Sequence, residues 1–312
     1  MLLLLLFLVS RYLVFWLGWP SLSETLGALT SDNQATEANA KGLGILAGYV
    51  LSLIALIFYT YKTPQVTLEM ESDRYSGWTT YFIRAMFWAI FLTGLVDVII
   101  SFMRVENFLE PVFGLQITQV IDQARSRGTY IHYPLILVSF VIAAFTRSLG
   151  FFWLATLVVL AEFGIVISRF VFSYEQAFMG DLVRYWYAAL FLFSSAYTLV
   201  EGGHVRVDVL YEKFSERGKA WTNIWGSLLL GLPVCWTILT LGMSSKQSSL
   251  IAPIINFEVS QSGYGMYVKY LMAGFLVVFA ISMAMQFTAY FLKSAHLILS
   301  DKSLDSPTKE AA

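Results

Sequence analysis

Long uninterrupted runs of apolar residues alternate with short polar connections along the whole chain. A membrane-spanning helix needs about 20 consecutive, mostly apolar residues, and several runs reach or approach that length. The runs are apolar at successive positions and do not alternate with polar residues, which is typical of helices and not of barrel strands. The pattern predicts an all-α, polytopic membrane protein with about eight transmembrane helices. We expect them at residues 2–18, 43–61, 81–103, 133–146, 149–172, 182–200, 224–243 and 267–292.

Two of these runs leave alternatives open. Residues 2–18 could be a signal peptide, but they lack a basic region before the leucines and a clear small-x-small cleavage motif, so a retained span is expected. The run at 133–146 is short, and only Arg147 and Ser148 separate it from the next run. Residues 133–172 could therefore form a tight hairpin of two helices or one long tilted helix.

Basic residues in the short connections predict the orientation of the chain, because cytoplasmic loops are enriched in Lys and Arg. The connection 201–220 and the tail after the last span are the most basic, and both are expected in the cytoplasm together with both termini. The connection 104–132 fits this topology poorly, since it would place three arginines outside. The basic residues that set the orientation are Arg206, Lys213, Arg217, Lys219, Lys293, Lys302 and Lys309.

The composition agrees with a membrane protein. Of the 312 residues, 57% are hydrophobic and 13% are charged, whereas soluble domains carry about 25% charged residues. The net charge of −1 and the scattered basic residues argue against a nucleic-acid partner, which would select for a basic face. The single cysteine, Cys235, excludes a disulfide framework within the chain.

Ionisable residues inside the apolar runs are the first candidates for functional groups, because they are costly in lipid and usually face protein or water. Glu162 and Arg169 lie seven residues apart, so a helix would point both side chains the same way. We interpret them as contacts within the protein or to a second subunit, with an ion or proton path as the alternative. Asp97 and Arg11 each stand alone in a run and could pair with each other or with a partner chain. Asp181 is placed to begin a helix, where a carboxylate meets the positive end of the dipole.

The connection 201–220 predicts an amphipathic helix at the cytoplasmic membrane surface. Gly202 and Gly203 would end the preceding span, and apolar residues then recur at helical spacing. Alternation in this segment would also suit a strand, but a lone strand at the membrane would have no pairing partner. An ordinary basic loop that only fixes the topology is the simpler alternative. The apolar residues at helical spacing are Val207, Leu210, Tyr211 and Phe214.

The sequence carries none of the common signals for catalysis. His132, His204 and His296 lie at or beyond the ends of the predicted spans, which argues against paired axial ligands for a haem. There is no CxxC pair, no GxxxxGK[ST] loop and no GxSxG motif in the sequence. We therefore expect no enzyme activity, no cofactor and no metal site.

Two stretches in the second half of the chain resemble a known family. Residues 167–172 read ISRFVF, and a later span ends in EGGHVRVDVL at residues 201–210. The two motifs, placed one helix apart, resemble the small permease of TRAP transporters, the DctQ-like or Q subunit. The resemblance covers about residues 149–296. It implies an N-terminal extension of three or four spans (1–148), a four-helix DctQ-like domain (149–297) and a polar cytoplasmic tail (298–312).

The resemblance also implies a function. TRAP systems import organic acids across the bacterial inner membrane with an ion gradient, usually of sodium. A periplasmic binding protein (P) delivers the substrate to a large M subunit, and the Q subunit packs against M as a static scaffold within the lipid bilayer. Substrate sites would then belong to M, and the polar residues of this chain would be structural or would contact a subunit. These residues are Glu162, Arg169, Asp181, Glu201, His204, Arg206 and Asp208.

Two other classes of function stay open at this point. The aromatic content of 16% would suit a membrane-anchored redox or quinone-reactive subunit, which predicts cofactor absorbance after purification. A self-sufficient secondary transporter would use Asp97, Glu162 and Arg169, and it predicts uptake without other subunits.

Overall fold

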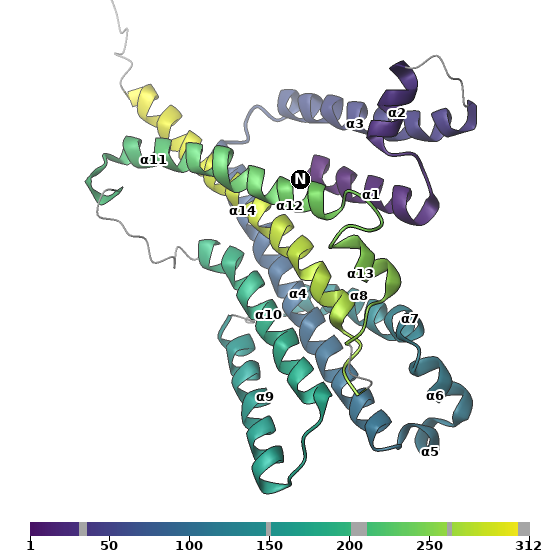
Figure 1. Ribbon diagram of the computed structural model, residues 1–312. Coiled ribbons are helices and arrows are strands. Elements are labelled where there is room, and N and C mark those ends of the chain that lie inside the picture. Colours follow the sequence, from purple (N-terminus) through teal and green to yellow (C-terminus); the bar gives the residue numbers. More distant parts are fainter. Residues whose placement is uncertain (31–35, 148–150, 201–210, 261–263, 305–312) are drawn as a thin grey trace, which may run out of the picture. The chain divides into compact units, whose positions relative to one another are not determined.

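The chain is built from helices. The computed structural model describes residues 1–30, 36–147, 151–200, 211–260 and 264–304, and the elements within these ranges are helices without a strand. This confirms the all-α prediction. Packing divides the chain into two compact units, Met1–Glu71 and Ser72–Ala312, whose helices are labelled in Figure 1.

Six helical segments within the described residues are long and apolar enough to cross a membrane. The number rises to seven if α1 (Leu2–Leu17) and α2 (Leu22–Thr30), which are bent by 84° relative to each other, count as one span. Within the described residues, each of the eight predicted runs is mainly helical. However, α10 (Ala177–Val200) does not meet this criterion and α1 alone is too short for it. The six spans are Ala40–Lys62, Leu68–Val105, Ala124–Phe145, Phe152–Phe172, Glu216–Gly242 and Lys269–Ser300.

The unit Met1–Glu71 contains α1, α2 and α3 (Thr36–Lys62), and α3 packs against both of the others. The leucine-rich α1 ends at Gly18, whose φ of 66° lies in the left-handed region that favours glycine. Gly42 of α3 leaves room for the side chain of Thr25 of α2. Ser10 Oγ of α1 lies 3.2 Å from the Tyr49 hydroxyl of α3.

The helix α4 (Leu68–Val105) extends well beyond the predicted apolar run of 81–103. Its 38 residues span about 57 Å at 1.5 Å per residue, whereas the hydrocarbon core of a bilayer is about 30 Å thick. The helix therefore continues into polar sequence at its N-terminal end. The short helices α5 (Leu109–Phe113), α6 (Leu115–Ile121) and α7 (Ala124–Arg127) follow it.

Residues 133–172 contain two helices and not one long helix. The helix α8 (Tyr133–Phe145) ends where Thr146 adopts extended backbone, with φ −96° and ψ 130°, and α9 (Phe151–Val171) follows. Trp88 Nε1 of α4 donates a hydrogen bond to Thr146 Oγ1 at 2.9 Å. This contact holds the end of α8 against α4.

Two of the spans contain a short π-helical segment that ends two residues before a proline. The segment η1 (Gly128–His132) joins α7 to α8 before Pro134, and η3 (Gly226–Gly231) joins α11 (Glu216–Trp225) to α12 (Leu232–Gly242) before Pro233. Proline lacks the N–H of a regular helix and its ring clashes with the carbonyl four residues earlier. A wider π turn relieves this clash while the helix continues, so both spans begin earlier than predicted.

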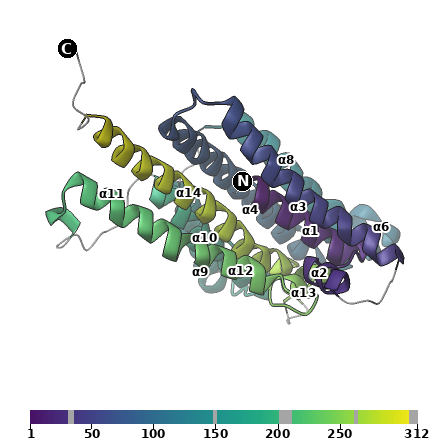
Figure 2. The same cartoon turned by 90° about the horizontal axis from the view of Figure 1, so that it is seen from above.

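The helix α14 (Lys269–Leu304) is the central element of the second half of the chain. The helices α10, α11, α12 and α13 (Ile251–Asn256) all pack against it, and α9 packs on α10. Figures 1 and 2 show α9, α10 and α14 side by side. Of the expected amphipathic segment, residues 201–210 lie outside the described residues. Tyr211–Lys213 forms a single 3-10 turn (η2), and α11 starts after the cap at Ser215.

An aromatic core holds the unit Ser72–Ala312 together. The rings of Tyr185 and Phe193 of α10 lie with their centroids 5.1 and 5.2 Å from that of Phe275 of α14. Phe87 of α4 reaches the same cluster, 6.2 Å from Phe193. All four side chains are buried, and burying such rings is a large hydrophobic gain. The helix α4 is thus anchored in the same core as α10 and α14.

Candidate functional site

A fully buried polar cluster lies where α4, α7–η1 and the start of α14 meet. The carboxylate of Asp97 accepts from three donors: Oδ1 lies 3.1 Å from both Arg127 Nη1 and His132 Nε2, and Oδ2 lies 2.8 Å from the Tyr267 backbone N. The side chains of Asp97, Arg127 and His132 are all fully buried. A buried charge is tolerated only when it is paired and hydrogen-bonded, and these three donors meet that condition.

His132 extends this cluster to α14. Its Nδ1 lies 2.7 Å from the Tyr270 hydroxyl. One neutral tautomer satisfies both ring nitrogens, with Nε2–H donating to Asp97 and Nδ1 accepting from Tyr270. Gly128, one turn before His132, allows this close packing, because a Cβ there would lie 2.5 Å from the Phe257 ring and 2.8 Å from the Tyr270 hydroxyl.

Two arginines of the connection 104–132 pack on the ring of Tyr267. The guanidinium carbons of Arg127 and Arg104 lie 4.1 and 4.6 Å from its centroid, as in cation–π contacts. Arg104 Nη2 donates to the Gly265 carbonyl at 2.7 Å, and Arg127 Nε donates to the Ile121 carbonyl at 2.9 Å. These arginines are therefore engaged inside the protein. Of the three arginines that fit the predicted topology poorly, two therefore have partners within the protein, and the third, Arg125, is exposed.

Contacts bring three separate connections to the same end of the helices. Tyr174, between α9 and α10, donates to Glu106 after α4 at 2.8 Å. Asp181 Oδ2 of α10 accepts from the Met266 backbone N at 3.0 Å. Desolvation, followed by the hydrogen bond to Glu106 and its charge, raises the pKa of Tyr174 to about 12. The connections 104–132, 173–181 and 244–268 thus share one end, as the predicted topology expects.

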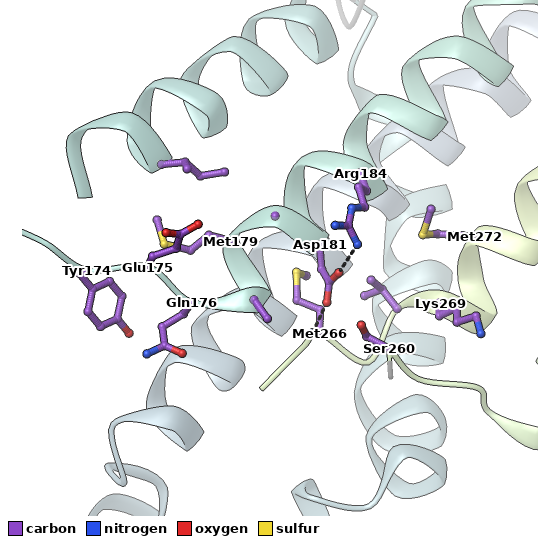
Figure 3. Close-up of a pocket in the computed structure, with 14 residues that line it drawn as sticks. Tyr174, Glu175, Gln176, Met179, Asp181, Arg184, Ser260, Met266, Lys269 and Met272 are labelled. Atoms are coloured by element: carbon purple, nitrogen blue, oxygen red, sulfur yellow. Dashed lines mark hydrogen bonds and ion pairs between the residues drawn. The ribbon is translucent and has the colours of Figure 1, made fainter. Parts of the chain in front are cut away.

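A cavity of about 700 Å³ lies at this end, between the C-terminal half of α9, the first turns of α10 and the start of α14. Figure 3 shows Asp181 between Arg184 and the chain at Met266, with Lys269 on the α14 side. Arg184 Nη1 lies 3.4 Å from Asp181 Oδ1, and Lys269 Nζ lies 2.9 Å from Glu258. The other lining residues are Ile165, Tyr174, Glu175, Gln176, Ala177, Met179, Gly180, Ser260, Met266, Val268 and Met272.

Gly265 is required for the contact between α10 and the connection before α14. A Cβ at this position would lie 2.5 Å from Asp181 Oδ2 and 2.6 Å from the Ser260 Cβ. Asp181 itself is the fifth residue of α10, because this helix begins at Ala177 and not at the predicted Leu182. Its carboxylate therefore binds a neighbouring segment and does not cap its own helix.

The structure separates the other intramembrane charges that the sequence singled out. Arg169 forms an ion pair of 3.4 Å with Glu175, and both side chains are exposed. Glu162 is exposed on α9 and has no ion-pair or hydrogen-bond partner in the described part of the chain. Arg11 lies in the other unit, with its guanidinium carbon 5.1 Å from the Phe7 ring. Asp97 finds its partners within its own unit.

Four further candidate residues cannot be placed. Glu201, His204, Arg206 and Asp208 lie outside the described residues, so their assignment to structural or subunit contacts stays a prediction.

The sequence pattern did not reveal that Arg127, His132, Tyr267 and Tyr270 belong to one site. The interpretation of His132 as a residue at the edge of a span is corrected, since η1 continues the helix and buries the ring completely. The available signal was Asp97 itself, because a carboxylate inside a span requires a partner of opposite charge. The partner lies 30 residues away, in a segment that looked like an exposed loop.

Comparisons with known proteins identify the second half of the chain. A family model described as "Tripartite ATP-independent periplasmic transporters, DctQ component" matches residues 155–296. A search of curated proteins and a search of solved structures each found no match. The matched residues include the cavity, Tyr267 and Tyr270, whereas Asp97, Arg127 and His132 precede them.

The family consists of transporter components and is not an enzyme family. Together with the membrane-spanning helices, it implies a multi-pass protein of the bacterial inner membrane. Residues 155–296 match the DctQ family, whose members are components of tripartite ATP-independent periplasmic (TRAP) transporters.

Proposed function

We propose that this chain is a static scaffold for the large M subunit of a TRAP transporter, which imports an organic acid with an ion gradient, in most such systems of sodium. The DctQ domain supports the assignment to a TRAP transporter. The periplasmic binding protein would select the substrate, and M would carry both the substrate site and the ion site. The role of this chain would be to enlarge the fixed part of the complex.

The main support for the scaffold role is the position of Glu162. It is the twelfth of the 21 residues of α9, close to the middle of the span. A charged side chain at the centre of a bilayer costs about 2.5–3.5 kcal/mol on insertion scales. The side chain is exposed, and so are its large apolar neighbours Val159, Phe163 and Val166. A protein partner that covers this face of α9 would remove the cost, and the M subunit fits that requirement.

The distribution of the other charges favours a scaffold over a self-sufficient transporter. Asp97 is buried and satisfied by Arg127, His132 and the Tyr267 backbone. Glu162 and Arg169 are exposed on α9. The three residues that such a transporter would use therefore do not line one common site.

The proposed orientation follows the positive-inside rule. Both termini would be cytoplasmic, and the end that carries the cavity and the connections 104–132, 173–181 and 244–268 would face the periplasm. This would place the cavity on the side from which a periplasmic binding protein approaches. Cysteine substitutions at exposed Glu110 and exposed Lys213, labelled from the outside of intact cells, test this orientation, because only the first should react.

The test of the scaffold role is co-purification of M with the tagged chain from native membranes, using wild type and Glu162→Leu. Removal of a charge that faces a polar group of M should lower the recovery of M, while the isolated chain becomes no less stable. Glu110→Leu, an exposed carboxylate of α5 outside the DctQ domain, is the matched control. Recovery of the chain alone from wild-type membranes, or with haem or flavin proteins, would overturn the proposal.

A second pair of variants separates assembly from substrate recognition. Arg169→Ala and Asp208→Ala should weaken the association with M more than they change the apparent affinity for substrate in whole-cell uptake. Unchanged co-purification together with a shifted substrate affinity would contradict the scaffold role.

A further inference from the structure

We propose that the cavity between α9, α10 and α14 binds one phospholipid with a zwitterionic, ethanolamine-type headgroup. The proposal concerns this chain alone and does not depend on the association with M. It rests on the depth, polarity and charge of the residues that line the cavity.

The polarity of the lining changes with depth. Glu175 and Gln176 lie in the connection beyond the end of α9, and Lys269 is the first residue of α14. Ile165 lies seven residues inside the end of the span at Phe172, which corresponds to about 10 Å along a helix. The cavity is therefore polar at the level of the helix ends and apolar toward the bilayer centre, with Met179, Met266, Val268 and Met272 as further apolar residues. A phospholipid has the same gradient from headgroup to acyl chain.

The charges of the rim balance each other. Two carboxylates, Glu175 and Asp181, and two cations, Arg184 and Lys269, line the cavity. Glu175 pairs with Arg169 and Asp181 pairs with Arg184, each at 3.4 Å. A headgroup with a phosphate and an ammonium can match both signs, whereas a purely anionic headgroup would compete with these carboxylates for their cations and offer them no replacement. Figure 3 shows Arg184 and Lys269 on the side of Asp181 that faces away from Glu175.

Arg184 and Lys269 have N–H donors that remain available for a phosphate. A guanidinium carries five N–H donors, and the ion pair of Arg184 with Asp181, at 3.4 Å, involves Nη1 only. The fork of the guanidinium suits phosphate oxygens. Lys269 donates to Glu258 and has two further N–H bonds. Its long stem allows the ammonium to reach the headgroup level.

The volume also suits a lipid headgroup and the first part of the acyl chains. At about 700 Å³ the cavity falls in the range of small-molecule sites. A water-soluble organic acid would need more polar contacts than the apolar depth around Ile165 and Met272 offers. A protein segment is the remaining alternative, and the experiment below separates it from a lipid.

The experiment is native mass spectrometry of the purified full chain during stepwise removal of lipid by detergent. The wild type should retain one phosphatidylethanolamine after annular lipid has been lost. Arg184→Gln removes a phosphate donor, and Met272→Trp fills the apolar part of the cavity. Each should lower the retained fraction at least fivefold. Arg125→Gln, an exposed arginine of α7 at the same end of the helices, should leave it unchanged.

Selectivity and folding controls complete the test. Delipidated wild type should bind added phosphatidylethanolamine at least fivefold more tightly than phosphatidylglycerol. Circular dichroism melting checks that each variant is folded, and Lys269→Gln replaces any variant that is not. The proposal is overturned if folded cavity variants retain lipid like the wild type, or if the two lipids bind equally. It is also overturned if the variants release a protein partner while the retained lipid stays unchanged.

Discussion

The buried pair of Asp97 and Arg127 gives the sharpest prediction about stability. Asp97→Ala removes an acceptor from Arg127 Nη1, His132 Nε2 and the Tyr267 backbone N in one step. The guanidinium of Arg127 would then be a buried charge without a close carboxylate, because Asp122 Oδ1 lies 3.9 Å from Nη2 and the Asp122 side chain is 41% exposed. Removal of one member of a buried ion pair costs about 3–5 kcal/mol.

The double variant tests whether the loss comes from the unpaired charge. Arg127→Met alone should cost a similar amount, since it leaves the Asp97 carboxylate buried without its cation. The double variant Asp97→Ala/Arg127→Met buries no unpaired charge. It should therefore be at least as stable as the less stable of the two single variants. The coupling energy from this cycle is expected to be about 2–3 kcal/mol. Asp122→Ala, which removes only the distant and exposed carboxylate, should cost less than about 1 kcal/mol.

The assay is reversible unfolding of the full chain in mixed micelles, followed by tryptophan fluorescence. A loss of 3–5 kcal/mol corresponds to a fall in Tm of about 6–20 °C for a unit of this size. Strictly additive effects of the two substitutions, or a loss below about 1 kcal/mol for Asp97→Ala, would refute the reasoning. Either result would mean that water or lipid headgroups satisfy these charges in place of the protein.

Two further predictions concern the end of the helices that carries the cavity. Gly265→Ala would place a methyl group against Asp181 Oδ2 and Ser260, so it should lower Tm by several degrees, while Gly226→Ala, where a Cβ meets nothing within 4 Å, should not. Tyr174→Phe should remove one tyrosine that ionises near pH 12 from the ultraviolet absorbance titration. Because the folded pKa lies above the usual value of about 10, the stabilisation by this hydroxyl is complete below pH 10 and is lost as the pH rises through 12. A difference between wild type and variant that titrates near pH 10 would contradict the contact with Glu106.

The observed ends of the helices show what the apolar runs in the sequence could and could not predict. Continuous apolar runs predict helices because backbone groups in lipid must find partners within the segment, and each of the eight runs is mainly helical within the described residues. The ends were predicted less well. The helix α4 continues through polar residues from Leu68, and the segment before Pro134 stays helical through a π turn. An apolar run indicates which part of a helix lies within the bilayer, but it does not indicate where the helix ends.

The partners of the intramembrane charges could not be predicted. The sequence indicated that Asp97 needs a partner, and it suggested Arg11 or a partner chain. The partner in the structure is Arg127, which was not among these candidates. Tertiary packing decides the choice, because the turn of chain between α4 and α8 brings Arg127 and His132 back to the level of Asp97. Such a contact depends on the path of a connection, which hydrophobic periodicity does not encode.

The sequence by itself determined the class of this protein and the family that residues 155–296 match. The apolar runs require a bilayer, and the motifs around Arg169 and His204 resemble the DctQ family that the comparison finds at residues 155–296. Only the tertiary structure showed that Asp97, Arg127 and His132 form one buried network with α14, and that a cavity opens beside Asp181. The physical reason is the range of the interactions. Burial in lipid acts on each segment separately, whereas ion pairs and cavities arise between segments that meet only after packing.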